Sequence, residues 1–316
     1  MPIQRRTLLL TAAAGAASAL LIACGGGDHD PNVVEVAQAD ARFSVLVEAI
    51  TAAGLADTLS GSGPFTVFAP TNDAFVALLG ELGMSKDALL ADKPLLTAVL
   101  KYHVLGSKVV LADVPVGKAI TSLQGGVFKI EVDGGPAITD GRNRKSNITQ
   151  TDIRASNGVI HVIDKVILPA NKTIVETAQS ISDFSILVEA VVAAGLVGTL
   201  NSAGPFTVFA PTNAAFAAAL TELKLTKAEL LASPLLGDIL KYHVVAGRVL
   251  KAEVPIGADI PTVWGATETL RISATLAITD EARRSSNITA TDVFTSNGVI
   301  HVLDKVILPS AFATAG

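Results

Sequence analysis

The sequence predicts an α+β protein built from two tandem domains of one fold. The chain has 316 residues, and about 150 residues is a usual size for one domain. Long stretches recur about 140 residues apart, and in each copy helical spacing comes before β-rich runs. Half of the residues are apolar and only 17% are charged, so each copy can bury a core.

The internal repeat is long and nearly free of gaps. Residues 43–72 match residues 184–213 at 22 of 30 positions, and a Lys-Tyr-His-Val tetrad recurs 140 residues later. A period of this size belongs to a self-sufficient domain and is too long for a solenoid unit. We therefore predict repeat 1 at residues 33–170 and repeat 2 at residues 171–309, with a tail at 310–316. The short join between them should limit their relative motion.

The N-terminal residues have the layout of an export signal. Arg5 and Arg6 precede an apolar run that ends in Leu-Ile-Ala-Cys at Cys24, and this run is short for a membrane-spanning helix. Its end resembles the bacterial lipobox, whose cysteine is lipidated and becomes the mature N-terminus. We predict a signal peptide at 1–23 and a lipidated Cys24 with a flexible tether at 24–32. The export route, Sec or twin-arginine, stays open, and the alternative is a plain cleaved signal with an accidental cysteine.

Apolar spacing and capping residues predict the early elements of each repeat. Apolar residues at i, i+3, i+4 and i+7 from Phe43 indicate an amphipathic helix that ends near Gly54. Residues 65–69 are apolar on both faces and predict a buried strand, which Pro70 ends because it has no N–H for a ladder. The Thr-Asn pair that follows can cap a second helix.

Strand patterns dominate the later part of each repeat. Between residues 108 and 140, short β-rich runs are broken by Gly and Pro. Residues 147–155 and 159–168 indicate two strands joined at Asn157-Gly158, a dipeptide that type I′ turns favour. Early helices and late strands predict an α+β domain with a mainly antiparallel sheet or sandwich.

Three sequence boxes follow one another in the same order in both repeats. In repeat 1 they are FTVFAPTN from Phe65, Tyr-His at Tyr102, and NGVIHVIDKVILP from Asn157. This arrangement resembles the fasciclin-type (FAS1) domain family, and the resemblance covers nearly all of residues 33–309. It implies a compact β-sandwich or wedge with several helices, no enzymatic activity, and a secreted or anchored protein of adhesion and matrix contact.

The resemblance also implies a partner-binding surface. In animal matrix proteins of this family, the Tyr-His region and an Asp-Ile pair are linked to cell-adhesion binding. The matching positions are Tyr102, His103, Asp152 and Ile153 in repeat 1, and Tyr242, His243, Asp292 and Val293 in repeat 2. Thr151 stands where the animal motif has proline, and repeat 2 has valine in place of isoleucine, so no particular receptor is implied.

Other chemistry lacks a motif in this sequence. Two histidines recur in each repeat without carboxylates or histidines at ligand spacing, so we expect no metal or other cofactor. His161 lies in an apolar strand and is interpreted as a buried, hydrogen-bonded side chain. No phosphate loop, activated nucleophile or paired-carboxylate motif is present. A net charge of −5 and the lack of a basic block beyond the first six residues argue against nucleic acid as a partner.

These observations predict an exported, non-enzymatic lipoprotein of the cell envelope, on the outer membrane, in the periplasm or on the cell surface. Its two FAS1 domains would contact a protein or glycan of a cell surface or matrix, and its lipid anchor would be the membrane contact. The alternative is a binding protein for a small apolar ligand held between helices and sheet. An unrecognised hydrolase would need polar residues converging in a cleft, which the sequence does not indicate.

Overall fold

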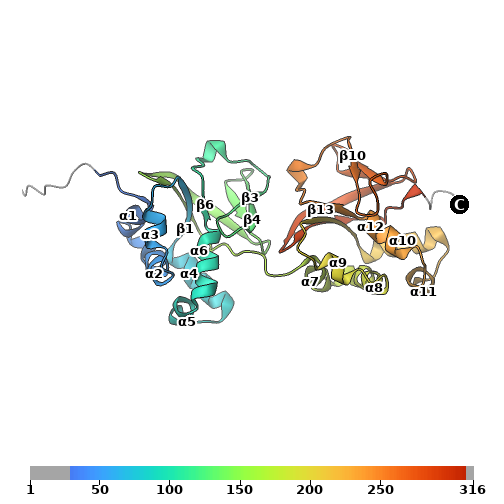
Figure 1. The fold of residues 1–316 in the computed structure, drawn as a ribbon, viewed down its shortest axis with the longest axis horizontal. Helices are drawn as coiled ribbons and strands as arrows, with labels where there is room; N and C mark the ends of the chain where they lie inside the picture. Colours follow the sequence, from blue (N-terminus) through green and yellow to red (C-terminus); the bar gives the residue numbers. More distant parts are fainter. Residues whose placement is uncertain (1–28, 311–316) are drawn as a thin grey trace, which may run out of the picture. The chain divides into compact units, whose positions relative to one another are not determined.

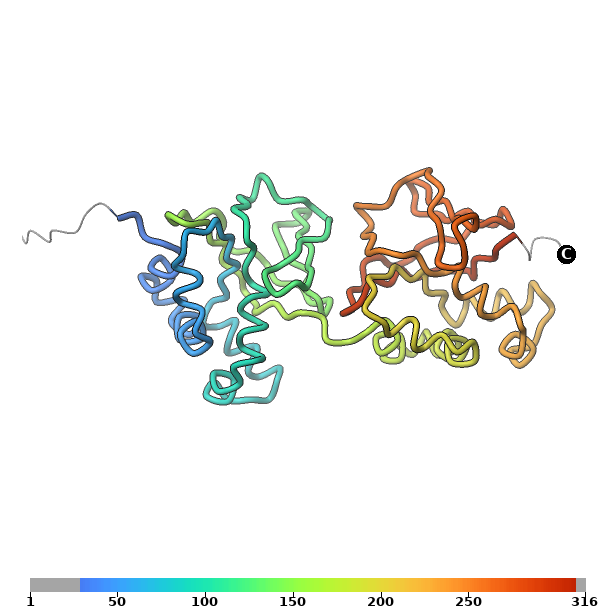
Figure 2. The backbone as a smooth tube through the Cα atoms, viewed as in Figure 1, coloured from blue at the N-terminus to red at the C-terminus, as the bar shows by residue number. Residues whose placement is uncertain are grey.

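The computed structural model describes residues 29–310, and both repeats lie within the unit that begins at Pro31 (Figure 1). The predicted signal peptide, Cys24 and the first part of the predicted tether lie outside the described residues. The backbone trace passes once from repeat 1 into repeat 2, near residue 170 (Figure 2).

Repeat 1 places most of its helices before most of its strands. Its helices are α1 (Val33–Gln38), α2 (Ser44–Ala52), α3 (Ala56–Ser60), α4 (Asn72–Leu82), α5 (Lys86–Ala91) and α6 (Lys93–Tyr102), with 3-10 turns η1 (Ala41–Phe43) and η2 (Leu111–Asp113). Its strands are β1 (Phe65–Pro70), β2 (Val104–Leu105), β3 (Ile120–Thr121), β4 (Val127–Glu131), β5 (Ala137–Thr139), β6 (Lys145–Ala155) and β7 (Gly158–Ile163). They form one sheet in the order β2-β1-β7-β6-β5-β4-β3.

Repeat 2 has the same succession of elements. Its helices are α7 (Ile174–Gln179), α8 (Ser185–Ala193), α9 (Val197–Leu200), α10 (Asn213–Leu223), α11 (Lys227–Leu231) and α12 (Leu236–Tyr242), with 3-10 turns η3 (Ser182–Phe184) and η4 (Lys251–Glu253). Its strands are β8 (Phe206–Pro211), β9 (Val244–Ala246), β10 (Asp259–Pro261), β11 (Thr269–Ile272), β12 (Ala277–Thr279), β13 (Ser285–Thr295) and β14 (Gly298–Leu303). The sheet order is β10-β11-β12-β13-β14-β8-β9.

Each sheet is mainly antiparallel and contains one parallel pair. β1 runs parallel to β7, and β8 runs parallel to β14, while the other neighbouring strands of both sheets are antiparallel. Strands in parallel pairs are typically buried on both faces, and β1 is buried along nearly its whole length. The predicted α+β architecture is confirmed, and the strand predicted to be apolar on both faces is the one in the parallel pair.

Two apolar cores lie on opposite faces of β1. Val67 and Ala69 belong to the core formed with the helices, which gather on one side of the sheet (Figure 1). Phe68 points to the other face, into a core shared with Phe128 of β4 and Ile138 of β5. β1 therefore contributes apolar side chains to both cores, which explains why its residues lack the apolar–polar alternation of a half-exposed strand.

The strand-to-helix step after β1 is as predicted. Thr71 is the N-cap of α4, and its Oγ1 accepts a hydrogen bond from Ala74 N at 3.3 Å. Asn72 fastens the same turn to α2, because its Oδ1 accepts from Val45 N at 3.0 Å. The ten residues GPFTVFAPTN thus encode a strand, a break and a cap.

The turn between β6 and β7 differs from the prediction. The hairpin is present, but neither Asn157 nor Gly158 has the positive φ that a type I′ turn needs. Asn157 is buried instead: its Oδ1 accepts from Val33 N at 2.9 Å and its Nδ2 donates to Leu59 O at 2.8 Å. A Cβ at Gly158 would lie 2.2 Å from a β1 carbonyl oxygen. The dipeptide is thus explained by close backbone packing, and β7 ends at Ile163, short of the predicted residue 168.

Candidate interaction site

The four residues of the two Tyr-His pairs are internal. Tyr102 and Tyr242 are 0% exposed, and His103 and His243 are 2% exposed. Each pair lies where a helix ends and a short strand begins, between the two apolar cores of its repeat. The surface position that the resemblance implies is therefore wrong for these four residues.

The tyrosines fasten elements together from inside each repeat. Tyr102 Oη donates a hydrogen bond to Val127 O at 2.6 Å and accepts one from Gly141 N at 2.8 Å. In repeat 2, Tyr242 Oη makes the corresponding bond to Thr269 O at 2.7 Å. Burial raises the pKa of both tyrosine hydroxyls, so they remain protonated donors.

The histidines of these pairs are neutral and held at both ring nitrogens. His103 Nδ1 donates to Val99 O at 2.7 Å, and its Nε2 accepts from Ile167 N at 3.0 Å. His243 makes the same two bonds to Ile239 O and Ile307 N. Burial lowers the pKa of each imidazole to about 4. Both nitrogens are occupied by backbone groups, so these rings have a structural role.

The Asp-Ile pair lies in a β-bulge of the long strand before the hairpin. Asp152 in β6 and Asp292 in β13 have φ of 60° and 61°, and the strand register shifts at both places. Asp tolerates the left-handed region better than most residues, and a bulge redirects a side chain. In each repeat the Asp Oδ1 accepts from the first N–H of a 3-10 turn that lies 41 residues earlier in the chain, Leu111 of η2 at 2.9 Å and Lys251 of η4 at 2.8 Å.

A second histidine supports this bulge from the sheet. His161 is 1% exposed, its Nδ1 accepts from Asp152 N at 3.3 Å, and its Nε2 donates to Val109 O at 2.9 Å. His301 makes the equivalent bonds in repeat 2 at 3.2 and 2.9 Å. The interpretation of His161 as a buried, hydrogen-bonded side chain is confirmed. The sequence did not indicate that it holds the bulge in place.

The two residues of the Asp-Ile pair face opposite ways. Asp152 is exposed, whereas Ile153 is half-buried and packs against the helix-side core. Asp152 lines a surface hollow of about 310 Å³. We call this hollow the Asp152 face; it is lined by Lys108, Val110, Asp152, Arg154 and Val159. Lys108 and Arg154 are site residues that the motif comparison missed.

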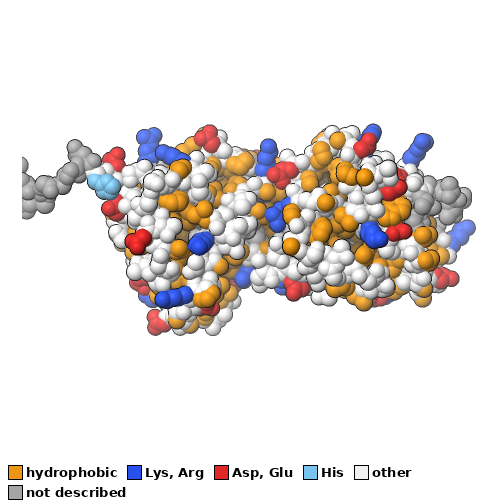
Figure 3. Space-filling model, viewed as in Figure 1, with side chains coloured by type: hydrophobic (Ala, Val, Ile, Leu, Met, Phe, Trp, Pro, Cys, Tyr) orange, Lys and Arg blue, Asp and Glu red, His pale blue; other side chains and the backbone are white. Residues whose placement is uncertain are grey.

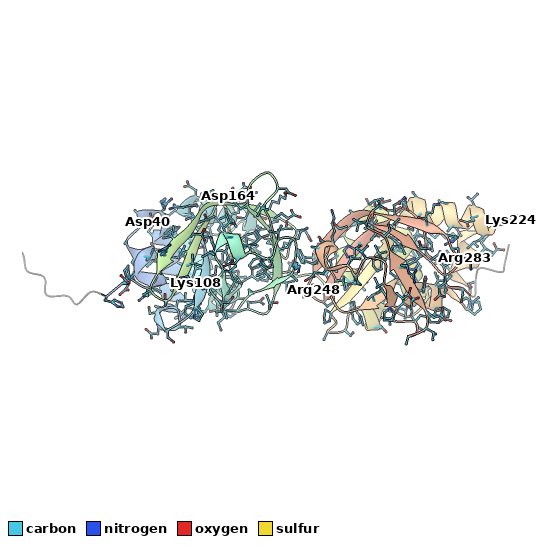
Figure 4. All side chains as sticks on the ribbon, turned by 90° about the horizontal axis from the view of Figure 1, so that it is seen from above. Asp40, Lys108, Asp164, Lys224, Arg248 and Arg283 are labelled. Carbon is cyan, nitrogen blue, oxygen red and sulfur yellow. The ribbon has the colours of Figure 1, made fainter. Side chains whose placement is uncertain are left out.

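The same surface of repeat 2 is covered. We call it the Asp292 face, and its residues, which correspond one by one to those of the Asp152 face, are Arg248, Leu250, Asp292, Phe294 and Val299. Figure 4 labels Lys108 and its counterpart Arg248. Asp292 is only 4% exposed, and its Oδ2 accepts a hydrogen bond from Lys129 Nζ of repeat 1 at 2.9 Å. Burial alone would lower the pKa of Lys129, but its bonds to Glu131 and Asp292 raise it, so the ammonium group stays charged.

Further contacts of repeat 1 complete this cover. Asn143 pairs with the backbone of Phe294: its Oδ1 accepts from Phe294 N at 2.6 Å, and its Nδ2 donates to Phe294 O at 3.1 Å. Phe294, Leu250 and Val299 form an apolar cluster with Val127 and Ala119 of repeat 1. The two equivalent sites thus differ in exposure as well as in some of their residues: repeat 1 covers the site of repeat 2, and its own site is open.

Other candidate sites in the described residues give little support to other chemistry. An apolar cavity in repeat 2, between α7, α8 and the sheet, has a volume of about 30 Å³, roughly enough for one water molecule. Ligand pockets are typically about 300–1,000 Å³, so this cavity does not favour the alternative of an apolar ligand. Within residues 29–310, no cluster of three or more His, Cys, Asp or Glu side chains has a geometry suited to a metal ion.

The described part of the chain also contains no helix with the length and apolar character needed to cross a membrane. On the face that Figure 3 shows, Lys and Arg side chains alternate with Asp and Glu among uncharged residues.

Comparison with known proteins gives consistent matches. The fasciclin domain model matches residues 41–169 and 182–309. Protein sll1483 of Synechocystis sp. is 45% identical over 143 residues, covering 45% of this chain and 76% of that protein. Rabbit transforming growth factor-beta-induced protein ig-h3 is 31% identical over 259 residues, covering 81% of this chain and 36% of its own length. The chain therefore spans only about a third of that animal relative.

A solved structure is also matched. It is a FAS1 domain pair from the insect cell adhesion molecule fasciclin I, matched with a TM-score of 0.44 and 17% identity, over 86% of this chain and 97% of the other.

Proposed function

The chain belongs to the fasciclin domain family, and from this premise we propose that it is a non-enzymatic interaction protein of the cell envelope. Repeat 1 binds a protein or glycan of a cell surface or matrix through the Asp152 face. The observation that carries this proposal is that a site with the same internal structure occurs once in each repeat. It is covered by protein in repeat 2 and open to solvent in repeat 1.

The chemistry of the Asp152 face suits a polar partner with an apolar contact. Asp152 Oδ1 accepts a hydrogen bond from Leu111 N, and in the equivalent Asp292 the other carboxylate oxygen, Oδ2, accepts from a lysine. Lys108 and Arg154 add exposed cations, and the half-buried Val110 adds a small apolar surface, whereas Val159 is only 1% exposed. A preorganised carboxylate loses less side-chain entropy when a partner binds.

The absence of a catalytic role is supported by how the histidines are used. All four histidines of the two repeats bond to backbone groups through both ring nitrogens. A general base needs a nitrogen that can reach a substrate proton. These rings are therefore committed to holding the fold.

Attachment to the envelope rests on Cys24, which lies outside the described residues. We propose that it is lipidated after export and that the residues between it and Pro31 tether the body to the membrane, since two or more acyl chains hold a protein durably. Pro31 and Asn32, which the sequence assigned to the tether, belong to repeat 1: Pro31 O accepts from Ser156 N, and Asn32 is the N-cap of α1. Fatty-acid labelling of cells tests this. The wild-type chain should be labelled and the Cys24→Ser variant should not, and equal labelling of both would contradict the proposal.

The interaction is tested by a pull-down of envelope and extracellular components with the full chain. An Asp152→Asn variant keeps an oxygen acceptor for Leu111 and tolerates positive φ, while it removes the charge. We expect it to lose at least about tenfold in captured partner. The matched control is Asp292→Asn, whose carboxylate is already covered by repeat 1. Equal capture by wild type and Asp152→Asn would overturn the proposed site.

A further inference from the structure

We propose that a second copy of this chain occupies the Asp152 face, docking through the outer surface of its repeat 2 in the way that repeat 1 covers repeat 2 within one chain. This inference rests on the proposed function, because it names a partner for the same face. It starts from the contact between the repeats, in which an Asp292-type face meets a surface built on β4.

The surface of repeat 2 equivalent to the covering surface of repeat 1 follows from strand register. Lys129 lies opposite Thr139 in the β4–β5 pair, and Arg271 lies opposite Thr279 in the β11–β12 pair. Ala119, Gly126, Val127, Lys129 and Asn143 of repeat 1 thus correspond to a set that we call the outer face of repeat 2: Asp259, Glu268, Thr269, Arg271 and Arg283. Figure 4 labels Arg283 of this set. Asp259, Arg271 and Arg283 are exposed.

The first pair of counterparts keeps its charges. Lys129 donates to Asp292 within the chain. The corresponding residues of two docked copies are Arg271 on the outer face of repeat 2 and Asp152 on the Asp152 face. Their backbone positions are equivalent, and Asp152 keeps the same left-handed φ and the same bond from Oδ1. An arginine can bind a carboxylate through two N–H groups, so the exchange of Lys for Arg preserves the contact.

The second pair replaces an apolar contact by opposite charges. Phe294 packs against Val127 and Ala119 within the chain. Between two docked copies, Arg154 stands in place of the phenylalanine and Asp259 in place of the alanine. Both sides of the contact have changed from apolar to charged, and the two charges are of opposite sign.

At the third pair, a cation faces an anion between the two copies, whereas the corresponding contact within one chain has only a cation. Arg248 and Gly126 line one cavity at the contact between the repeats. Their counterparts are Lys108 and Glu268. Among the described residues, Oε2 of Glu268 is buried without a hydrogen-bond partner, and the neighbouring Glu281 raises the pKa of Glu268. A cation at this point would relieve the repulsion between the two carboxylates.

Three charge pairs therefore match in sign across the docked surfaces, whereas two other contacts acquire like charges: Asn143 with Phe294 becomes Arg283 near Arg154, and Ala119 with Glu253 becomes Asp259 near Asp113. A contact of this type joins different faces of the two copies, and such a heterologous contact repeats without closing unless rotation brings it into a ring. Exposed ion pairs contribute little individually and are screened by salt, so the association is weak and salt-dependent in dilute solution. Tethering the chains to one surface would strengthen it by raising their effective concentration.

The test is a charge exchange at the second pair, because Arg154 makes no ion pair within the described chain and Asp259 pairs only with exposed Arg271. Arg154→Glu and Asp259→Arg are made separately in the full chain, with Cys24→Ser in every sample so that acyl chains do not drive association. Sedimentation velocity over a concentration series measures self-association. Each variant alone should bind itself at least about tenfold more weakly than wild type. An equimolar mixture should recover association, since each variant then meets a partner of opposite charge at both ends.

The matched control exchanges an exposed pair elsewhere, Lys86→Glu with Glu48→Lys, which should leave self-association unchanged. The proposal is overturned if wild type does not associate at millimolar concentration, if either variant alone associates like wild type, or if the mixture fails to recover while both variants give wild-type thermal unfolding. If self-association is absent and the pull-down still depends on Asp152, the proposed function stands and only this inference fails. If neither depends on Asp152, both fail.

Discussion

Asp152 and Asp292 share the same backbone conformation, an equivalent supporting histidine and an equivalent hydrogen bond from a 3-10 turn earlier in the chain, yet Asp152 is exposed and Asp292 is buried. The difference lies entirely in their neighbours. Repeat 1 contributes a lysine and an apolar cluster to Asp292, while the surface around Asp152 carries Lys108 and Arg154. A duplicated site can therefore keep its internal construction while its two copies serve different contacts.

In contrast to the surface sites, the interiors of the two repeats are nearly the same. His103 and His243 bond to corresponding backbone groups in their own repeats, and burial lowers the pKa of both to about 4. Equivalent substitutions in the interior should therefore have similar effects in the two repeats. Equivalent substitutions at the surface sites should have different effects. The predictions that follow use this distinction.

The largest expected effect is on stability at acid pH. The pKa of His103 and His243 is about 4 in the fold, against 6.5 for an ordinary histidine. The folded state thus binds fewer protons than the unfolded state between these values. Each neutral histidine contributes about 3 kcal/mol to the free energy of unfolding. This contribution is fully present above pH 6.5 and is lost as the pH falls towards 4. Urea unfolding at a series of pH values measures this loss.

His103→Gln and His243→Gln separate the contributions of the two repeats. Glutamine can both donate and accept, and it does not titrate. Each variant should remove a similar part of the pH dependence between pH 6.5 and 4, because the two environments match. Unequal effects would show that the interiors differ more than their hydrogen bonds indicate.

The same distinction explains what the sequence revealed and what it did not. The helix from Ser44, the buried strand from Phe65 and the cap at Thr71 follow from apolar spacing and residue chemistry within a few neighbours. The Asn157-Gly158 dipeptide was misinterpreted, because its partners are about 100 residues away in the chain. Local patterns carry no information about such long-range packing.

The candidate site was only partly predictable for a similar reason. The family motif led to Asp152 correctly as an exposed residue, but it led to Tyr102 and His103, which are buried. A motif marks residues that the fold needs as well as residues that a partner contacts. Aligning the repeats could have drawn attention to Arg154, because a charged residue there corresponds to Phe294.

A smaller effect is expected from breaking the contact between the repeats. Lys129→Ala would leave the Asp292 carboxylate buried without its cation. Removing one partner of a buried pair costs about 3–5 kcal/mol, and we expect about 2 kcal/mol here because Oδ1 of Asp292 keeps its hydrogen bond from Lys251 N. Urea unfolding of the full chain measures the loss. Lys86→Ala, in an exposed pair with Glu48, is the control and should change stability by less than about 1 kcal/mol. Equal effects would mean that the Asp292 face is not covered in solution.

The smallest effect concerns one position where the interiors differ. Leu78 of α4 is 2% exposed, and its counterpart in α10 is Ala219, which lines a small cavity of about 10 Å³. Ala219→Leu restores the side chain that repeat 1 has, and cavity-filling changes commonly add about 0.5–2 kcal/mol. We expect a gain of about 1 kcal/mol, because the cavity is small and the surrounding side chains must move outward to admit the leucine.

Thermal and urea unfolding of the full chain measure this gain, and Leu78→Ala is the reciprocal variant. Its expected cost is larger, about 3 kcal/mol, since a truncated core leucine leaves a cavity that relaxes only in part. If Ala219→Leu instead lowers stability, the side chains around α10 have already closed over the missing leucine. The core of repeat 2 would then be a different packing solution for the same fold, and its smaller side chain would not be a defect.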